Sequence, residues 1–310
     1  MARIGAKTLK VSSLSQIFLA CAICAGVAGC GARQTRIAKA PTGAPLKTAT
    51  KADLIAKYDQ LARSITSINA AVTMQWTSSS SFTGIMKQYP RVSGFILAQK
   101  PDLVRVIGQA PVISTNIFDM VSDGKTFSIY IPSKNQFLTG STSVEKASDT
   151  TAVQNLRPQH LMQAIFWEPI SPSDVVLLEQ AMDGNSSDYV LTVANSGGGN
   201  SGGREAASSN WRIARKIWFE RAGLSMARIE VYGDDGQVES DIHYAQWQPF
   251  GAVEYPQKIT LERPAEGYTL AITVMKLTAD TTIEPSRFVL KQPPGSQLVH
   301  VGEETGSPQH

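Results

Sequence analysis

Hydrophobic and polar positions along this chain follow two different periods. From Lys51 to about Ala70, apolar residues recur at steps of three and four, which is the spacing of one buried helix face. Thr50 and Asp53 stand at capping-box spacing at the start of this segment. The pattern predicts a helix over residues 51–70 whose apolar stripe covers another apolar surface.

After this segment the period changes to two, which predicts β-strands. Short alternating runs occur around residues 72–76, 95–97, 104–106 and 127–131, and Asp123-Gly124 between two such runs predicts a tight hairpin turn. Further along, alternation predicts strands over residues 189–194, 211–220, 226–232, 238–247, 257–262, 268–277 and 288–290. Because several of these runs have one apolar and one polar set, we expect long antiparallel strands.

Helical spacing returns between residues 150 and 181. It predicts one helix that ends before Trp167 and a second, short helix that begins near Ser171-Pro172 and carries Val175, Leu177 and Leu178. The whole pattern predicts a mainly β (α+β) domain over residues 51–292. Residues 293–310 are mostly polar, and we expect them to form a disordered tail.

The first thirty residues have the layout of a secretory signal peptide. Three basic residues precede an apolar run over residues 11–29, and no Asp or Glu occurs before Cys30. An uncleaved transmembrane anchor is the alternative. It would be short and polar, because the run has 19 residues with three serines and a glutamine, whereas a span needs about 20 mostly apolar residues.

Val27-Ala28-Gly29-Cys30 resembles the lipobox of bacterial lipoproteins. The resemblance implies a signal peptide over residues 1–29, cleavage before Cys30, and acylation of Cys30 on its sulfur and its new amine. Two or more acyl chains hold a protein stably on a membrane, so residues 30–50 are expected to be a lipid anchor and flexible tether. Gly31 stands where an Asp would resemble an inner-membrane retention signal. The expected location is therefore the periplasmic side of the outer membrane, or the cell membrane where no outer membrane exists.

Charge and cysteine content narrow the class of function. The chain has 29 Lys and Arg against 26 Asp and Glu, and removal of the three basic residues before Cys30 leaves 26 of each. Nucleic-acid-binding proteins usually carry a basic excess or stripe, so we expect no nucleic-acid partner. All three cysteines lie at or before position 30, which leaves the mature domain without disulfides.

No constellation in the sequence indicates catalysis. Gly199-Asn200-Ser201-Gly202-Gly203 resembles the nucleophile segment of chymotrypsin-type proteases, but Asn200 replaces an Asp and the surrounding Ser, Gly and Asn residues predict a loop. The four histidines lack metal-ligand spacing. We therefore expect a protein that is not an enzyme and that has no cofactor and no metal site.

Many large apolar side chains remain, and two interpretations of them stay open. They either fill a packed core or line a cavity for the acyl chains of a lipid. The candidates to line such a cavity are Trp76, Phe95, Leu97, Val104, Val106, Phe127, Ile129, Ile131, Leu161, Ile165, Phe166, Ile217, Phe219, Ile229, Leu270 and Ile272.

Residues 94–136 carry a resemblance to a known family. The segment contains Gly-Phe-Ile-Leu-Ala-Gln-Lys-Pro-Asp-Leu-Val-Arg-Val and then Asp-Met-Val-Ser-Asp-Gly-Lys-Thr-Phe-Ser-Ile-Tyr-Ile-Pro. It resembles the LolA/LolB family of periplasmic lipoprotein carriers and outer-membrane lipoprotein receptors, most clearly over residues 121–126. The resemblance implies a curved, unclosed antiparallel β-barrel with helices packed as a lid over an apolar cavity.

The same resemblance implies a function. The chain would bind acyl chains of lipids or of acylated lipoprotein cargo and act in lipoprotein sorting or outer-membrane biogenesis, with a periplasmic carrier or another envelope protein as partner. In the soluble carriers an Arg before the Pro of this motif latches the lid. That position here is Lys100, a point charge without the guanidinium fork. The alternative is an interaction or sensor module of the same fold that carries no cargo.

Overall fold

The computed structural model describes residues 45–301 except 80–85, 112–113, 143–156, 184–185 and 197–210. All described residues belong to one of the chain's two compact units, Gly43–His310, and this unit is treated by itself. Several predictions fall outside the described residues. They are the signal peptide, Cys30 and most of the tether, the loop around Gly199–Gly203, and the last nine residues of the predicted tail.

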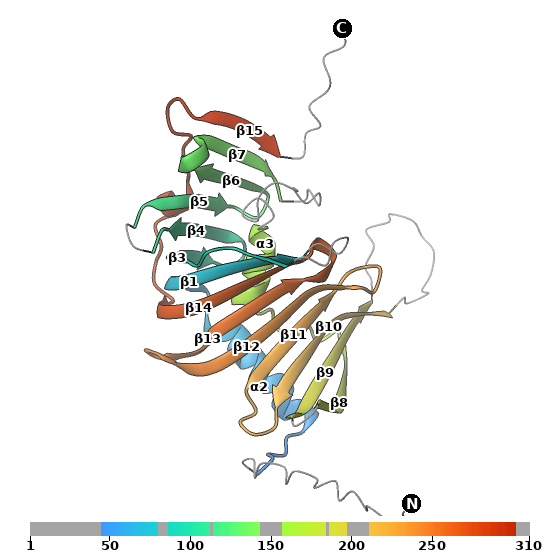
Figure 1. The fold of residues 1–310 in the computed structure, drawn as a ribbon. Coiled ribbons are helices and arrows are strands. Elements are labelled where there is room, and N and C mark those ends of the chain that lie inside the picture. The colour runs from blue at the N-terminus through green and yellow to red at the C-terminus, as the bar shows by residue number, and fades with distance from the viewer. Residues whose placement is uncertain are drawn as a thin grey trace, which may run out of the picture. The chain divides into compact units, whose positions relative to one another are not determined.

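A single large sheet organises this unit (Figure 1). Its strands are β1 (Ser67–Ser79), β2 (Met86–Gln88), β3 (Val92–Gln99), β4 (Leu103–Gln109), β5 (Asn116–Ser122), β6 (Thr126–Ile131), β7 (Gln136–Ser141), β8 (Val175–Asp183), β9 (Ser186–Ser196), β10 (Trp211–Glu220), β11 (Met226–Tyr232), β12 (Val238–Phe250), β13 (Val253–Arg263), β14 (Tyr268–Ala279) and β15 (Gln297–Val301). The order across the sheet is β15-β7-β6-β5-β4-β3-β1-β14-β13-β12-β11-β10-β9-β8, with β2 paired to β1 beside this path.

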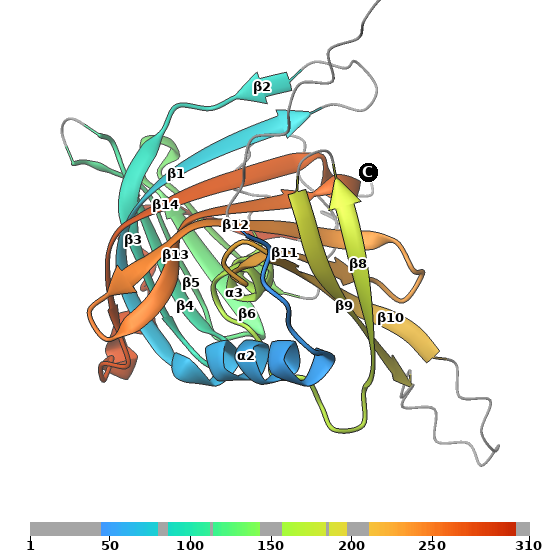
Figure 2. The same ribbon diagram turned by 90° about the horizontal axis from the view of Figure 1, so that it is seen from below.

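The two halves of the sheet meet at the antiparallel pair β1–β14, where Val72 lies opposite Val274. Strands β3 to β7 follow on one side of this pair, and β13 back to β8 follow on the other. Among the described residues, β8 and β15 are the two edges and do not pair with each other, so the sheet is mostly antiparallel and not closed. Figure 2 shows that it curves strongly.

Two glycines on neighbouring strands make room for large interior side chains. Gly94 on β3 lies opposite Gly108 on β4. A Cβ atom at Gly94 would lie 1.9 Å from the carbonyl oxygen of Ile107, and one at Gly108 would lie 2.2 Å from a ring carbon of Phe118. The ring of Phe118 therefore occupies space that a side chain at Gly108 would need, and it packs edge-on against Trp76 at 5.8 Å.

The described residues include two α-helices, α2 (Lys51–Ser64) and α3 (Pro158–Ile165). The predicted capping box is present, since Thr50 and Asp53 exchange hydrogen bonds at the start of α2. Figure 2 shows α3 inside the curve of the sheet and α2 across its open side. Neither helix is long and apolar enough to cross a membrane, and this statement covers the described residues alone.

The interior of the curve is a packed hydrophobic core. Side chains from both halves of the sheet and from both helices form one continuous cluster. Val104, Ile129, Leu161, Ile217 and Leu270 are 0% exposed within it. Burial of a side chain of this size contributes about 1.5–3 kcal/mol. The helices are thus part of the hydrophobic core.

The chain returns across the outer face of the sheet before it ends. After β14, the short 3-10 turn η4 (Pro285–Phe288) packs against β4, where Arg105 donates to the carbonyl oxygen of Arg287 at 2.9 Å. Phe288 is buried. Strand β15 then pairs in parallel with β7. The prediction of disorder from residue 293 is therefore wrong for residues 297–301, because backbone pairing with β7 fixes them.

Three sequence-based element predictions are corrected by the structure. The first helix ends at Ser64 rather than near Ala70, because Ile65 is already extended and β1 begins at Ser67. The second helix predicted after Ser171-Pro172 is strand β8. Its two exposed apolar residues, Val175 and Leu177, are apolar yet exposed, which hides the alternation that marks a strand. The strand predicted at 288–290 is the end of η4 and an extended segment.

Candidate binding site

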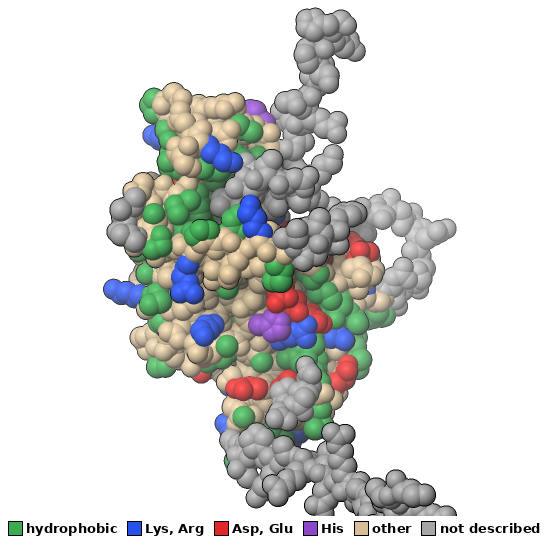
Figure 3. All heavy atoms as spheres, viewed as in Figure 1, with side chains coloured by type: hydrophobic (Ala, Val, Ile, Leu, Met, Phe, Trp, Pro, Cys, Tyr) green, Lys and Arg blue, Asp and Glu red, His purple; other side chains and the backbone are tan. Residues whose placement is uncertain are grey.

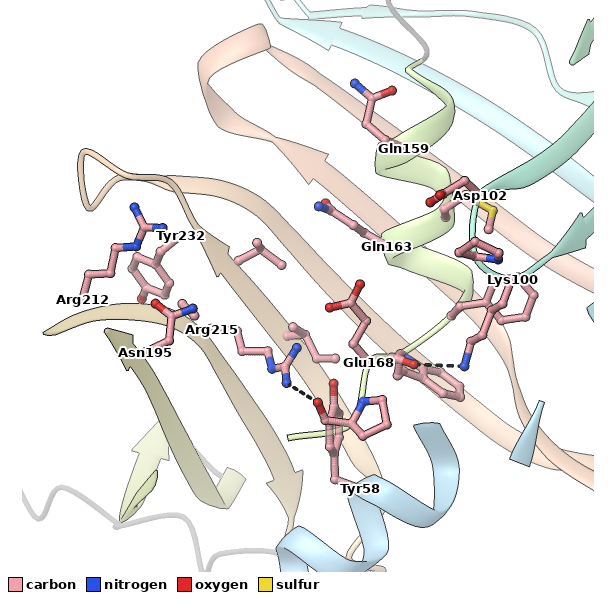
Figure 4. A pocket seen from close by; sticks show the side chains of 18 of the residues that line it. Tyr58, Lys100, Asp102, Gln159, Gln163, Glu168, Asn195, Arg212, Arg215 and Tyr232 are labelled. Atoms are coloured by element: carbon pink, nitrogen blue, oxygen red, sulfur yellow. Dashed lines mark hydrogen bonds between the residues drawn. The ribbon is translucent and has the colours of Figure 1, made fainter. Parts of the chain in front are cut away.

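A pocket of about 770 Å³ opens between α3, the residues that follow it, and strands β9 to β11 (Figure 4). This volume lies within the range of roughly 300–1,000 Å³ that is typical of small-molecule sites. Met162 and Phe166 contribute apolar surface on the helix side. Ile229 and Val231 of β11 contribute it on the sheet side. The pocket therefore has apolar walls from two different layers of the fold.

Polar side chains line the rest of the pocket. They are Lys100, Asp102, Gln159, Gln163, Glu168, Asn195, Arg212, Arg215, Tyr232 and Asp234. Arg212 pairs with Asp234 at one end. The site is amphipathic, which suits a ligand that has both an apolar and a polar part.

Lys100 connects both helical regions to the turn between β3 and β4. Its Nζ donates to the carbonyl oxygen of Ala62, in the last turn of α2, at 2.5 Å. It also donates to the carbonyl oxygen of Trp167 at 3.1 Å and lies 5.4 Å from the ring centre of Phe166. Burial lowers the pKa of Lys100, and the negative charge of Glu168 opposes that shift. The ammonium group satisfies one of the carbonyls that a helix end leaves without a partner.

The residues after α3, here called the 166–170 segment, are held by side chains from three elements. Lys100 binds the carbonyl of Trp167, and the Nη2 atom of Arg215 on β10 donates to the carbonyl oxygen of Pro169 at 3.1 Å. The amide of Ile170 donates to Asp59 of α2 at 2.9 Å. These three contacts are side-chain hydrogen bonds.

Beneath the 166–170 segment lies a cluster of aromatic rings. Trp167 packs against Tyr244, Trp247 and Tyr255 with ring centres 5.7 Å apart in each case. The hydroxyl of Tyr255 donates to the carbonyl oxygen of Ile165 at 2.8 Å, and burial raises the pKa of Tyr255 far above its usual range. This cluster belongs to or packs against the hydrophobic core, and its Tyr255 holds the C-terminal end of α3.

Few of the residues predicted to line a cavity reach the pocket. Phe166 and Ile229 line it, and so does Lys100. The others that face the inside of the curve belong to the packed core, and they are Trp76, Val104, Val106, Phe127, Ile129, Ile131, Leu161, Ile165, Ile217, Phe219, Leu270 and Ile272. Their side chains are buried together in one hydrophobic cluster of the described residues.

Phe95 and Leu97 lie on the wrong side of the sheet for a cavity. Phe95 is 41% exposed, and Leu97 lies in register with Arg105 on the outer face, outside the core cluster. The inward residues of β3 are Ile96 and Ala98. The error arises because the run from Phe95 to Ala98 is apolar on both faces, so alternation does not choose between them.

Apart from Lys100, the cations and amides of the pocket carry no pattern in the sequence that singles them out. Arg212 and Arg215 lie on β10, where a bulge between Ile213 and Arg215 shifts the register against β9. A bulge changes which residues face inward, and a regular period of two cannot show it. The available signal was three cations within five residues of one strand, Arg212, Arg215 and Lys216.

A second polar cluster lies on the outer face of β11 and β12, where Figure 3 shows acidic, basic and histidine side chains together. Arg228 binds Asp241 through two hydrogen bonds of 2.6 Å and Glu230 at 2.6 Å, while His243 lies 3.2 Å from Asp241. Burial raises the pKa of Asp241, but the bonds from His243 and Arg228 outweigh it and bring the pKa to about 2. The charges satisfy one another, so the cluster stabilises the sheet. The described residues contain no group of three or more side chains suited to hold a metal ion.

Comparison with known proteins gives structural matches only. No family model matches the chain, and no curated protein matches its sequence. A LolA superfamily protein from Nitrosomonas europaea is 12% identical with a TM-score of 0.45, over 79% of this chain and 99% of that one. A DUF1329 family protein from Desulfovibrio piger is 15% identical with a TM-score of 0.48, over 76% and 95%.

An outer membrane lipoprotein-sorting protein domain from Vibrio parahaemolyticus is 10% identical with a TM-score of 0.45, over 76% of this chain and 94% of that one. All three TM-scores are below 0.5. At these identities the likeness concerns the arrangement of elements alone.

Proposed function

We propose that this protein is a membrane-anchored, non-catalytic envelope protein that binds acyl chains of lipids or lipoproteins. The observation that supports this most directly is the pocket beside α3, which apolar side chains from the helix side and from β11 both line. Removal of a methylene group from water contributes about 0.8 kcal/mol, so an acyl chain gains most from a site with two apolar walls. The role that follows is in lipoprotein sorting or outer-membrane biogenesis.

In this proposal the 166–170 segment forms a movable cover. The 166–170 segment lines the pocket and is held by single side-chain hydrogen bonds: Lys100 and Arg215 donate to its carbonyl oxygens, and the amide of Ile170 donates to Asp59. Loss of these bonds would let the 166–170 segment move away from the sheet and lengthen the apolar surface open to a ligand, while α3 stays in the core. Lys100 is the proposed latch, since one ammonium group binds both helical regions.

The membrane anchor in this proposal is Cys30. Acylation there would place the domain on the periplasmic side of the outer membrane, within reach of a soluble carrier or another envelope protein. Mass spectrometry of the mature N-terminus tests this part separately. A triacylated cysteine is the expected result, and an unmodified Cys30 or an uncleaved N-terminus would contradict it.

Binding is tested on the soluble form from Gly31 to His310, which lacks Cys30 and keeps every described residue. Native mass spectrometry after purification from the periplasm should show about one lipid or acylated peptide per chain. Val231→Trp places a large ring in the pocket and should abolish the bound mass. Ile213→Trp is the matched control, because Ile213 is 38% exposed and does not line the pocket. An apo mass for the unchanged protein, with no uptake of a fluorescent fatty acid, would contradict the proposal.

The packed interior favours one other function, an interaction or sensor module that carries no cargo. Residues expected to line a cavity are in mutual contact in the core. Edge strand β8 also exposes Val175 and Leu177, at 44% and 58%. A defined protein partner that co-purifies with a lipid-free chain would support this second function.

A further inference from the structure

Arg215 is a cation in the pocket wall without a carboxylate partner among the described residues. Its Nη2 atom donates to the carbonyl oxygen of Pro169, and its guanidinium lies 5.6 Å from the ring centre of Tyr58. Its Nε atom is buried and has no hydrogen-bond partner. A buried donor left unpaired costs about 1–3 kcal/mol, so its retention in the pocket wall calls for an explanation.

The other charged side chains that line the pocket interact with other groups or lie in another part of the pocket. Arg212 forms an ion pair with Asp234. Lys100 binds two carbonyl oxygens, and Glu168 acts electrostatically on Lys100. Asp102 lies against Gly124, beside the turn between β5 and β6. Among the described residues that line the pocket, Arg215 is therefore the guanidinium without an ion-pair partner.

The surroundings of Arg215 define the class of ligand. A planar guanidinium matches a carboxylate or a phosphate through two parallel hydrogen bonds. Figure 4 shows Arg215 directed into the pocket, and the same pocket carries the apolar side chains of Phe166 and Ile229. One ligand can satisfy both features if it joins an acidic head to a hydrocarbon chain.

We propose that the pocket binds an anionic amphiphile whose carboxylate or phosphate group pairs with Arg215 and whose hydrocarbon chain lies between α3 and β11. This inference rests on the proposed function and adds the charge of the ligand head. The charge of Arg215 selects ligands with an acidic head group. The apolar walls bind the hydrocarbon chain and contribute the same affinity whatever the head group is.

The test is isothermal titration of the mature chain with probes that share one chain length, below their critical micelle concentrations. The probes are dodecyl phosphate, dodecanoate and neutral dodecyl maltoside, with inorganic phosphate as the free anion. Charge-assisted hydrogen bonds predict that the acidic probes bind about 10- to 100-fold tighter than the maltoside. Inorganic phosphate should show no binding at millimolar concentration, because it lacks the chain.

Two variants separate the charge of Arg215 from its packing. Arg215→Gln should lower dodecyl phosphate affinity about 10- to 100-fold and leave maltoside affinity unchanged. Arg215→Lys keeps the charge and loses the forked guanidinium. Its affinity for dodecyl phosphate should lie between those of the unchanged protein and Arg215→Gln. Lys216→Gln is the matched control, since the next residue of β10 lies in register with Glu230 on the outer face and should change nothing.

The outcomes distinguish the two proposals. Equal affinity for acidic and neutral probes, unchanged in Arg215→Gln, would overturn the inference that the ligand has an anionic head group. It would leave the proposal of acyl-chain binding intact. No binding of any dodecyl probe would overturn both. Inorganic phosphate that binds as tightly as dodecyl phosphate would show a free-anion site and overturn the amphiphile. If Arg215→Gln does not fold, the loss of selectivity in Arg215→Lys decides the question.

Discussion

The Nζ atom of Lys100 lies 3.1 Å from the carbonyl oxygen of Trp167, which joins the β3–β4 turn to the residues after α3. The same ammonium group reaches the carbonyl of Ala62 at the end of α2. One side chain thus connects the sheet to both helical regions. Hydrogen bonds from a charged donor contribute about 1.5–3 kcal/mol each at most, so their removal should be measurable.

Lys100→Met keeps most of the aliphatic stem and removes both hydrogen bonds. We expect the free energy of unfolding to fall by about 1–3 kcal/mol and the amides of the 166–170 segment to exchange hydrogen faster. Hydrogen exchange with mass spectrometry measures this. Lys258→Met, at an exposed position on β13, is the control. Unchanged exchange over residues 166–170 would show that Lys100 does not hold the segment.

Substitution of Ile129 tests whether this residue belongs to a packed core or lines a ligand cavity. It is 0% exposed, so Ile129→Ala should lower the free energy of unfolding by about 2–5 kcal/mol. The variant should keep the wild-type affinity for an acyl probe under conditions where it is folded. Urea denaturation and probe binding measure the two quantities. Loss of binding with unchanged stability would instead place Ile129 in a ligand site.

The sequence predicted most strands correctly and the candidate site only in part, for identifiable reasons. Strands β10 and β11 have the predicted limits, 211–220 and 226–232, and on β11 the alternation of Ile229 and Val231 with Arg228 and Glu230 is clear. Edge strand β8 was predicted as a helix because Val175 and Leu177 are apolar yet exposed. On an exposed edge strand, apolar residues can occur on both faces, so the alternation of apolar and polar residues that predicts a strand is lost.

The candidate site depends on side chains brought together over long distances in the sequence. Lys100, Trp167 and Arg215 meet only because the sheet curves around α3, and no local spacing encodes that meeting. The alternation of apolar and polar residues also predicts which side chains are buried. It does not show whether those side chains pack together or surround a cavity. The closed core around Phe127 and Ile272 is indistinguishable from a cavity lining at that level.

His160 makes stability sensitive to acid. Its ring lies in α3, 3.2 Å from the hydroxyl of Tyr268, and burial, aided by Arg263 and Arg157, lowers its pKa to about 3. Glu266 lies 3.8 Å away but is bound to Arg263 at 2.6 Å, which limits its effect.

An unfolded histidine has a pKa of about 6.5 and takes up its proton first as the pH falls, so acid favours the unfolded chain. Between pH 7 and pH 4 we expect a loss of about 3 kcal/mol in the free energy of unfolding from this residue. Urea denaturation at several pH values measures the slope. His160→Gln should flatten it over this interval, and an unchanged slope would assign the effect to other groups.

A substitution at Gly94 tests the close approach of strands β3 and β4. Gly94→Ala would bring a Cβ atom to 1.9 Å from a backbone oxygen, which a rotamer change cannot relieve. We expect a loss of at least about 3 kcal/mol in stability, measured by thermal or urea denaturation. Ser93→Ala, one residue away on the outer face, should change stability by less than about 1 kcal/mol. Equal effects of the two variants would contradict the contact.

The start of the described chain determines how the domain would carry mechanical load. The amide of Lys47 donates to the carbonyl of Arg221 at 2.8 Å, its ammonium reaches the carbonyl of Gly223, and the guanidinium of Arg221 donates back to Lys47. Tension applied from the N-terminal side therefore reaches the turn between β10 and β11 before it reaches α2. A pull on this end would be borne first by a hairpin of the sheet, and the contact of α2 with Lys100 would be loaded only after the bonds of Lys47 break.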